Sequence, residues 1–450
     1  MSRRALIAVL TAAGLALAAS PAARADWQRI TPVTPTTTTG EVALLRTPDG
    51  LHVVWRAHTS RFRNHITHRV VGNDGTLGAP RSVTEDWIEL GDPALTAGPD
   101  GLRVIFGGVH TTHPDEINTE INTAVSVDGG LNWGLQDGSI VPLGRGWADD
   151  AVSAAAQADG TPLAAWADGR GIWIHRGLDP NTAVTDLQAA LGPFGTGPGV
   201  AAADGRTVVA WFSGSPAARG VYAQDLGPDG ALLGTPAPMP DSTSLRTGMA
   251  ARTPVAVRPG GRAYVAYPTG SNASRAISLW SVGSARTVTI GRSTGAASTT
   301  VTAGASGRLW VAWTATVNGR RHVLARRSNP AVSRWGAVVD AGRPDGGATT
   351  GALNGSDANG ALDLMASFTI GDSDRASTFY ERVLPGLTMS VSGARVTVTD
   401  AGDPVPGVRI TGGGRRATTD ANGQATLRVA AGTVVRGTLA GYANATATAR

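Results

Sequence analysis

The sequence contains no cysteine and no lysine among its 450 residues. Without cysteine the chain has neither a disulfide framework nor a thiol-linked lipid anchor. Aromatic residues make up only 5% of the chain and charged residues 16%. Stability must therefore come from buried apolar surface, and a chain of this length can bury enough of it for two or three domains.

A long apolar stretch occurs only near the N-terminus. Arg3 and Arg4 precede an apolar run from Ala5 to Ala19, and small residues end at Ala25. About fifteen apolar residues are too few to span a bilayer comfortably but suit an export signal over residues 1–25. The arginine pair also fits twin-arginine export, so both routes remain open. We expect a secreted protein without a membrane span, and association with the cell surface is left open.

The remaining chain is nearly neutral. Of 39 basic residues, Arg3, Arg4 and Arg24 belong to the signal, which leaves a formal charge of +2 for residues 26–450. No run of arginines could follow a phosphate backbone, so we expect no nucleic-acid partner. No cofactor is expected either.

One phrase recurs seven times along the chain. It consists of a turn with Asp, Asn or Gly followed by alternating apolar residues that end on an aromatic, as in PDGLHVVW and ADGRTVVAW. The aromatic residues that end the phrases are Trp55, Phe106, Trp166, Trp211, Tyr267, Trp313 and Phe368. Their regular recurrence indicates a repeat protein.

Each phrase lies within a unit that reads as four β-strands. Short segments of period-two alternation surround it, separated by Gly, Asp and Pro, and no long helical periodicity occurs. The predicted fold class is therefore all-β, a seven-bladed β-propeller over residues 41–385. The last unit lacks a fourth strand, and residues 26–33 resemble the sequence around Trp335. Residues 26–40 are thus expected to supply a closing strand and a linker, which would remove an exposed sheet edge.

The composition changes near residue 386. The segment VRITGGGRRATTDANGQATLRV and its flanks resemble the carboxypeptidase regulatory-like β-sandwich, a small Ig-like or prealbumin-like fold. This resemblance covers residues 386–450 and implies a spacer or an adhesive module.

Residues 126–133, SVDGGLNW, resemble the Asp-box of secreted bacterial sialidase-type propellers through Ser126, Asp128, Gly130 and Trp133. In that family the box is a turn between the third and fourth strands of a blade, on the face away from the active site. A weaker copy spans residues 328–335. The resemblance therefore implies a scaffold role for the box.

Two catalytic features of that family are not found. Gly40 stands where the first arginine of the carboxylate-binding clasp belongs, and glycine cannot replace a planar bidentate donor. A tyrosine nucleophile is also expected. Each tyrosine has a place in a predicted strand or in the C-terminal module, so we predict no sialidase catalysis.

Some residues have no role in the repeats. Two tryptophans and three histidines fall in the loops of the first three blades, on the face around the channel mouth, and acids follow the tryptophans. The predicted ligand-binding residues are Trp87, Glu89, Asp92, Trp147, Asp149, Asp150, His58, His110 and His113. The tryptophans and acids could hold a sugar ring, or both tryptophans could fill blade junctions. His110, His113, Asp115 and Glu116 could instead hold a metal, although short loops gather such residues by chance.

Three functions remain open. The predicted function is a non-catalytic propeller, expected to be monomeric, that binds an extracellular glycan or protein surface through the loops of blades one to three. A sialidase-like glycoside hydrolase using Glu89, Asp92, Asp149 or Asp150 is an alternative. A structural protein of the cell envelope is the other.

Overall fold

The chain forms β-sheets throughout its described part. The computed structural model describes residues 27–31, 40–60, 63–110, 119–136, 141–143, 151–168, 171–179, 185–186, 195–245, 252–271, 273–295, 297–344, 347–370 and 376–450. No helix occurs in these ranges. They accordingly contain no helical segment able to cross a membrane.

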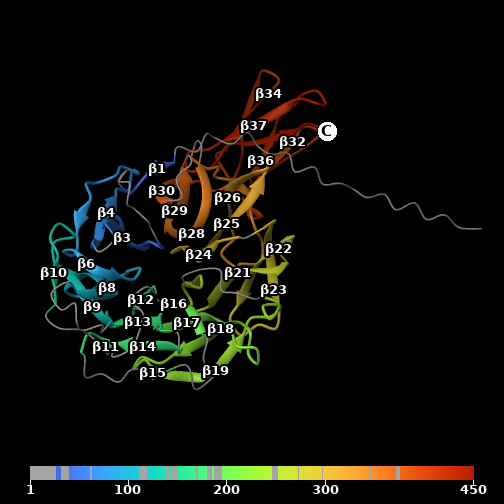
Figure 1. Cartoon of the computed structure of the whole chain (residues 1–450). Coiled ribbons are helices and arrows are strands. Elements are labelled where there is room, and N and C mark those ends of the chain that lie inside the picture. Colours follow the sequence, from blue (N-terminus) through green and yellow to red (C-terminus); the bar gives the residue numbers. More distant parts are fainter. Residues whose placement is uncertain are drawn as a thin grey trace, which may run out of the picture.

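Seven strands of the described chain surround a central axis (Figure 1). Each contacts the next in chain order, and the last contacts the first. These inner strands are β2 (Ala43–Thr47), β7 (Ala94–Gly98), β12 (Ser153–Ala156), β16 (Gly195–Ala203), β20 (Val255–Val257), β24 (Thr299–Ala303) and β28 (Gly347–Ala358). Sheets that radiate from such a ring form a β-propeller. The prediction of an all-β propeller is confirmed.

Antiparallel strands pair outward from each inner strand, and we name each unit after its inner strand. The β2 unit contains β3 (Gly50–Ser60), β4 (Arg63–Val71) and β5 (Arg81–Ser82). The β7 unit contains β8 (Gly101–His110), β9 (Thr119–Ser126), β10 (Gly134–Leu135) and β11 (Val141–Leu143). The β12 unit contains β13 (Pro162–Ala167), β14 (Ile172–Arg176) and β15 (Thr185–Asp186). The β16 unit contains β17 (Arg206–Ser213), β18 (Gly220–Leu226) and β19 (Leu232–Pro238).

The remaining units follow the same order. The β20 unit contains β21 (Ala263–Ser271), β22 (Ser274–Ser281) and β23 (Thr287–Ser293). The β24 unit contains β25 (Leu309–Val317), β26 (Arg320–Arg327) and β27 (Val339–Asp340). The β28 unit contains β29 (Ala361–Ile370), β30 (Ala376–Val383) and the N-terminal strand β1 (Gln28–Arg29). In β1, Gln28 pairs with Tyr380 and Arg29 with Phe379, so the two ends of the propeller sequence share one sheet.

The core consists of layers between neighbouring units. Trp211 of the β16 unit packs with Leu163 and Ile174 of the β12 unit, and Trp313 of the β24 unit packs with Tyr264 of the β20 unit. The second strands are buried on both faces, so β13 is buried at every position. The aromatic residues that end the repeated phrases thus fill the spaces between sheets, where large side chains bury the most apolar area.

On one face of the ring, a side chain of each unit donates a hydrogen bond to a turn carbonyl of the next. The pairs are His68 with Gly130, Arg103 with Gly160, Gln157 with Gly227, Arg206 with Gly261, Arg258 with Pro330, Arg327 with Gly360, and Arg382 with Asn73. The last pair joins the β28 unit to the β2 unit. These hydrogen bonds form a closed set within the described chain, and we call them the inter-unit links.

The turn at residues 126–133 is held by its own side chains. Oδ1 of Asp128 accepts hydrogen bonds from the backbone N–H groups of Leu131 (3.1 Å) and Asn132 (2.9 Å), and Oγ of Ser126 accepts one from Gly130 (2.8 Å). Hydrogen bonds that Asp128 accepts from the backbone and side chain of Asn132, and then from the Ser126 hydroxyl, lower the pKa of Asp128 to about 2. Trp133 packs edge-on against His68 of the neighbouring unit. The turn therefore connects two units.

His68 belongs to a buried chain of hydrogen bonds. Nδ1 of His52 lies 2.9 Å from Nε2 of His68, and Nδ1 of His68 lies 3.2 Å from the carbonyl oxygen of Gly130. Because the carbonyl can only accept, Nδ1 of His68 carries a proton and Nε2 accepts from His52. Thr47 lies 3.1 Å from Nε2 of His52. This arrangement requires the His68 ring to be neutral.

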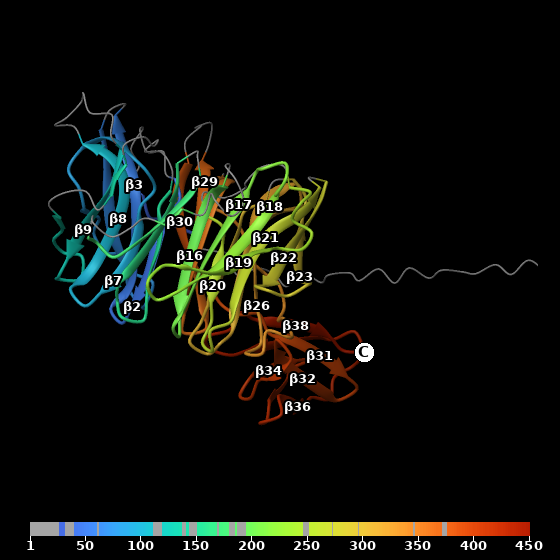
Figure 2. The ribbon, with the colours of Figure 1, turned by 90° about the horizontal axis from the view of Figure 1, so that it is seen from below.

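The C-terminal segment forms two further sheets. One contains β31 (Thr388–Ser392), β32 (Arg395–Asp400), β33 (Asp403–Pro404) and β36 (Gln424–Thr426). The other contains β34 (Arg409–Gly412), β35 (Arg415–Thr418), β37 (Val434–Thr438) and β38 (Ala445–Thr448). Apolar residues of both sheets share one core, which includes Val396, Ile410 and Val435. Figure 2 shows these strands against one face of the ring.

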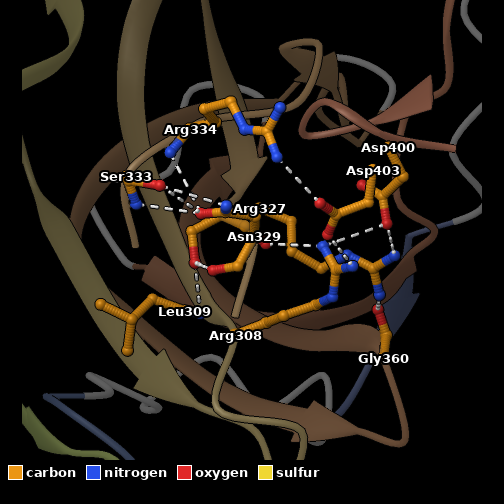
Figure 3. Close-up of polar contacts among 10 residues, drawn as sticks. Arg308, Leu309, Arg327, Asn329, Ser333, Arg334, Gly360, Asp400 and Asp403 are labelled. Atoms are coloured by element: carbon orange, nitrogen blue, oxygen red, sulfur yellow. Dashed lines mark hydrogen bonds and ion pairs between the residues drawn. The ribbon is translucent and has the colours of Figure 1, made fainter. Parts of the chain in front are cut away.

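A buried ion-pair cluster joins these sheets to the propeller (Figure 3). Arg327 pairs with the carboxylate of Asp400 and donates to the carbonyl of Gly360 (2.5 Å). Arg308 donates to Asp403 (2.7 Å) and lies 3.4 Å from Asp400, whose side chain is only 2% exposed. The Arg327 guanidinium also lies 5.7 Å from the ring centre of Tyr442 in the C-terminal segment. Arg327 therefore serves both an inter-unit link and this contact.

Acid should destabilise the fold through the histidine pair. Burial, together with the neighbouring His52, lowers the pKa of His68 to about 4, although the hydrogen bond to the Gly130 carbonyl acts in the opposite direction. Burial also lowers the pKa of His52. Below about pH 6.5 the unfolded chain binds protons that the folded chain excludes, so stability falls as pH drops from about 6.5 to about 4. At about 1.4 kcal/mol per pKa unit, His68 accounts for roughly 3 kcal/mol. Urea unfolding from pH 7 to 4 should show less loss in His52→Gln/His68→Gln, and an equal loss would contradict this explanation.

Removing Asp400 should loosen the C-terminal segment. Asp400→Ala leaves two arginines without their buried partner, which costs about 3–5 kcal/mol in comparable sites. We expect faster hydrogen exchange in β32 and β33 with little change in β17. Asp403→Ala is the matched control, because the Asp403 side chain is 31% exposed and its loss should matter less. Equal protection of β32 in wild type and Asp400→Ala would show that the ion pairs do not hold the segment.

Candidate ligand-binding site

A cavity of about 180 Å³ lies in the central channel among the inner strands. Its polar lining comes from five of the seven units. The polar lining residues are Glu41, Ser153, Arg252, Thr253, Thr300 and Asn354. Hydroxyl, amide, carboxylate and guanidinium groups thus face one small space.

Three charged residues lie shortly before inner strands. Glu41 lies two residues before β2, Asp92 two before β7 and Arg252 three before β20. Oδ2 of Asp92 accepts a hydrogen bond from the backbone N–H of Glu41 (2.7 Å), and Nε of Arg56 lies 3.6 Å from Oδ1 of Asp92. Asp92 is 5% exposed. Its carboxylate therefore fixes the start of β2 beside the start of β7.

Arg252 reaches across the channel from the β20 unit. Its Nε donates to the carbonyl of Val152 (2.9 Å), Nη1 to that of Val42 (3.1 Å) and Nη2 to that of Pro93 (2.6 Å). Nη1 also lies 3.7 Å from Glu41. The three carbonyls lie just before β12, β2 and β7, so a single guanidinium group sets the spacing of three strand starts. Its planar fork of donors suits this task.

Gly40 is required by this arrangement. A Cβ atom at Gly40 would lie 2.1 Å from Oδ1 of Asp92. Even a methyl group would collide with the carboxylate. An arginine of the sialidase type therefore has no room at this position while Asp92 is in place.

Trp87 lies in a blade junction. It begins β6 (Trp87–Leu90), a strand that joins β4 to β8, whereas the sequence predicted a connecting loop. Trp87 is 4% exposed, and its ring packs edge-on against Phe106 at 5.2 Å. The interpretation of Trp87 as an open platform for sugar is inconsistent with this burial, and the alternative of a junction residue fits it. The strand pairs with β8, and the register of this pairing shifts between Trp87 and Glu89.

Other predicted residues lie near this strand. Glu89 is exposed, and Asp92 is buried in the polar contacts described above. Nδ1 of His58 lies 2.6 Å from Oδ1 of Asn64, whose amide donates to the carbonyl of Ile88 (2.7 Å). The backbone of His110 pairs with that of Trp87. The strand β6 thus brings His58, Glu89, Asp92 and the end of β8 to the same part of the ring.

Several predicted residues lie outside the described part of the chain. They are His113, Asp115, Glu116, Trp147, Asp149 and Asp150. No group of three or more histidine, aspartate or glutamate side chains suited to a metal ion is found within the described ranges.

The tyrosines lie away from the cavity. Tyr380 is 2% exposed and its hydroxyl donates to Asp363 (2.8 Å). Burial raises the pKa of Tyr380. Tyr264 and Tyr267 are buried between sheets, Tyr222 stacks on Trp211, and Tyr442 belongs to the C-terminal segment. None lines the cavity.

Glu41, Arg56 and Arg252 were not predicted as site residues. One sequence pattern could have identified Glu41 and Arg252. In both cases a charged residue comes shortly before an apolar inner strand, as Arg252 does before the strand in TPVAV. Arg56 directly follows the repeated aromatic Trp55. Arg56 contacts residues of the next unit, whereas Arg252 contacts Val42 and Pro93 of units that only the closed ring brings near it.

Shortening Trp87 should reduce stability. Trp87→Ala removes a buried ring and is expected to cost about 3–5 kcal/mol in urea unfolding, whereas Trp87→Phe should cost less because an aromatic ring remains. Ligand binding per folded molecule should persist in Trp87→Phe. Unchanged stability in Trp87→Ala together with lost binding would restore the platform interpretation.

Comparisons with known proteins show similarity in fold alone. No protein-family model matches the chain, and no curated protein matches it. An α-L-arabinanase of Penicillium chrysogenum, solved with arabinobiose, is 12% identical, with 79% of this chain and 97% of that chain covered and a TM-score of 0.42. The six-bladed, fucose-recognising lectin of Aleuria aurantia is 10% identical over 78% and 97% of the chains, with a TM-score of 0.41. A puromycin hydrolase is 16% identical over 87% and 60%, with a TM-score of 0.46.

Proposed function

We propose that the chain is a secreted, non-catalytic propeller that binds a glycan at the channel cavity, on the face of the predicted ligand-binding residues. The supporting observation is the cavity lined by hydroxyl, amide and charged groups from several units. Sugar hydroxyls both donate and accept hydrogen bonds, and this set of groups can satisfy both. The cavity is smaller than the roughly 300–1,000 Å³ of drug-sized pockets, so the ligand group that enters it is a single terminal sugar.

The proposal includes an architecture. Residues 1–25 are the export signal, residues 26–40 the closing strand and linker, residues 41–385 a seven-bladed propeller of the Asp-box type, and residues 386–450 an Ig-like β-sandwich. The closed contacts among the inner strands support the blade number. The core shared by the two C-terminal sheets supports the sandwich.

We propose no catalysis because the carboxylates near the cavity are engaged in structural contacts. Asp92 is engaged by Arg56 and by the backbone of Glu41, and Glu41 lies beside Arg252. A glycosidase needs two carboxyl groups that flank the scissile bond and are free to exchange protons. Asp92 and Glu41 instead hold strand starts in register.

Isosteric removal of cavity groups should abolish binding without unfolding the ring. Thr300→Val/Asn354→Leu keeps side-chain volume but removes a hydroxyl and an amide, so we expect glycan affinity to fall at least about tenfold, the equivalent of 1.4 kcal/mol. Glycan-array screening of the wild type identifies the ligand, and calorimetry compares the variants.

Thr289→Val on the outer strand β23 is the matched control and should bind like the wild type. Equal affinity of the double variant and the wild type would refute binding at the cavity. Sugar release from aryl glycosides that Asp149→Asn or Asp150→Asn abolishes would refute the non-catalytic part and favour the hydrolase.

A further inference from the structure

Charge is divided unevenly between the propeller and the C-terminal segment. Residues 386–450 contain seven arginines and three aspartates, with no glutamate, for a formal charge of +4. Residues 26–385 contain 29 arginines and 31 acidic residues, for a formal charge of −2. The small C-terminal segment therefore has an excess of positive charge that the whole-chain balance conceals.

The three aspartates of this segment all have partners. Asp400 and Asp403 pair with Arg327 and Arg308 of the propeller. Oδ1 of Asp420 accepts the backbone N–H groups of Asn422 and Gln424 in its own turn (both 2.9 Å). The contact with the propeller thus neutralises two of the three negative charges of the C-terminal segment. The exposed arginines of this segment therefore have no carboxylate of the segment as a partner.

Arginine and threonine alternate on the outer face of one C-terminal sheet. Thr411 of β34 pairs with Arg416 of β35 on one side and with Arg436 of β37 on the other. Arg409, two residues before Thr411 on the same face, pairs with Thr418 and Thr438. Residues between them, such as Ile410 and Val435, point into the core. We call Arg409, Arg416, Arg436 and the threonines between them the basic face.

The basic face is exposed to solvent. Arg409, Arg416 and Arg436 are exposed, and within the described chain none of their side chains forms an ion pair. Arg416 and Arg436 lie two strands apart, roughly 10 Å at about 4.8 Å per strand. Regularly spaced charges on a sheet suit a polymer that offers several anionic groups at once, because each contact is weak alone and gains from the others.

The surrounding residues select among anionic polymers. Arginine binds carboxylates in planar, bidentate geometry, and the threonine hydroxyls can bond to sugar hydroxyls between them. No aromatic side chain lies on the basic face to stack on nucleic-acid bases. Val434 of β37 is the one large exposed apolar residue in this sheet, and a single such residue is too little to enter a membrane. We propose that the basic face binds an acidic polysaccharide whose sugars bear carboxylates.

Binding to polygalacturonate tests this proposal. By surface plasmon resonance at about 0.15 M salt, the full chain should bind the polymer, and Arg416→Gln/Arg436→Gln should weaken binding at least about tenfold. Arg395→Gln/Arg428→Gln is the matched control: it removes the same charge from exposed positions outside the basic face and should bind within about twofold of the wild type. Thr300→Val/Asn354→Leu should bind normally, which separates this face from the channel cavity.

Other outcomes would overturn the proposal. Equal losses in the two arginine double variants would show attraction by net charge alone. Binding to polyphosphate, duplex DNA or phosphatidylserine vesicles as tight as to polygalacturonate would show that carboxylated sugars are not selected. Unchanged affinity for methyl-esterified polygalacturonate would show that carboxylates are not recognised.

Discussion

The structure depends on the inter-unit links and the apolar layers that they border. A single sheet with both faces apolar cannot be stable in water, so each unit needs a neighbour on either side. Apolar packing supplies the free energy but does not fix how far one sheet slides along the next. A directional hydrogen bond from a side chain to a turn carbonyl does fix it, as Arg206 does at Gly261 (2.9 Å). With the link from Arg382 to Asn73, the ring closes and no unit can shift without straining the others.

Because of this constraint, the face of the ring that carries the inter-unit links and the opposite face have different roles. The linked face contains the turns whose carbonyls accept the inter-unit links, and the C-terminal segment contacts this face through Arg308 and Arg327. On the other face, Arg252 and Asp92 hold the starts of several strands together. A ligand site can form there because its groups sit on fixed strands, while the connecting segments are free to vary.

The sequence predicted the all-β propeller because its aromatic-terminated phrases repeat a local pattern, and that pattern needs no knowledge of distant contacts. The pattern could not place Trp87. A tryptophan followed by acids reads equally well as a sugar platform or as a junction residue, and only the pairing of β6 with β4 and β8 buries its ring. The site arginine Arg252 was missed for the same reason. Its three carbonyl partners lie 100 to 210 residues away and meet only after closure.

Because the chain contains no lysine, arginine alone supplies its permanent positive charges, both in the interior and on the surface. In the interior, a guanidinium group offers five donors in a plane and can satisfy several carbonyls at once, as Arg252 does, or join a carbonyl, a carboxylate and an aromatic ring, as Arg327 does. A lysine ammonium has three donors around a point and cannot span strand starts in this way. On the basic face the same group remains exposed, and strand pairing sets its spacing. Position in the fold, rather than residue type, therefore separates the arginines that build this protein from those available to a partner.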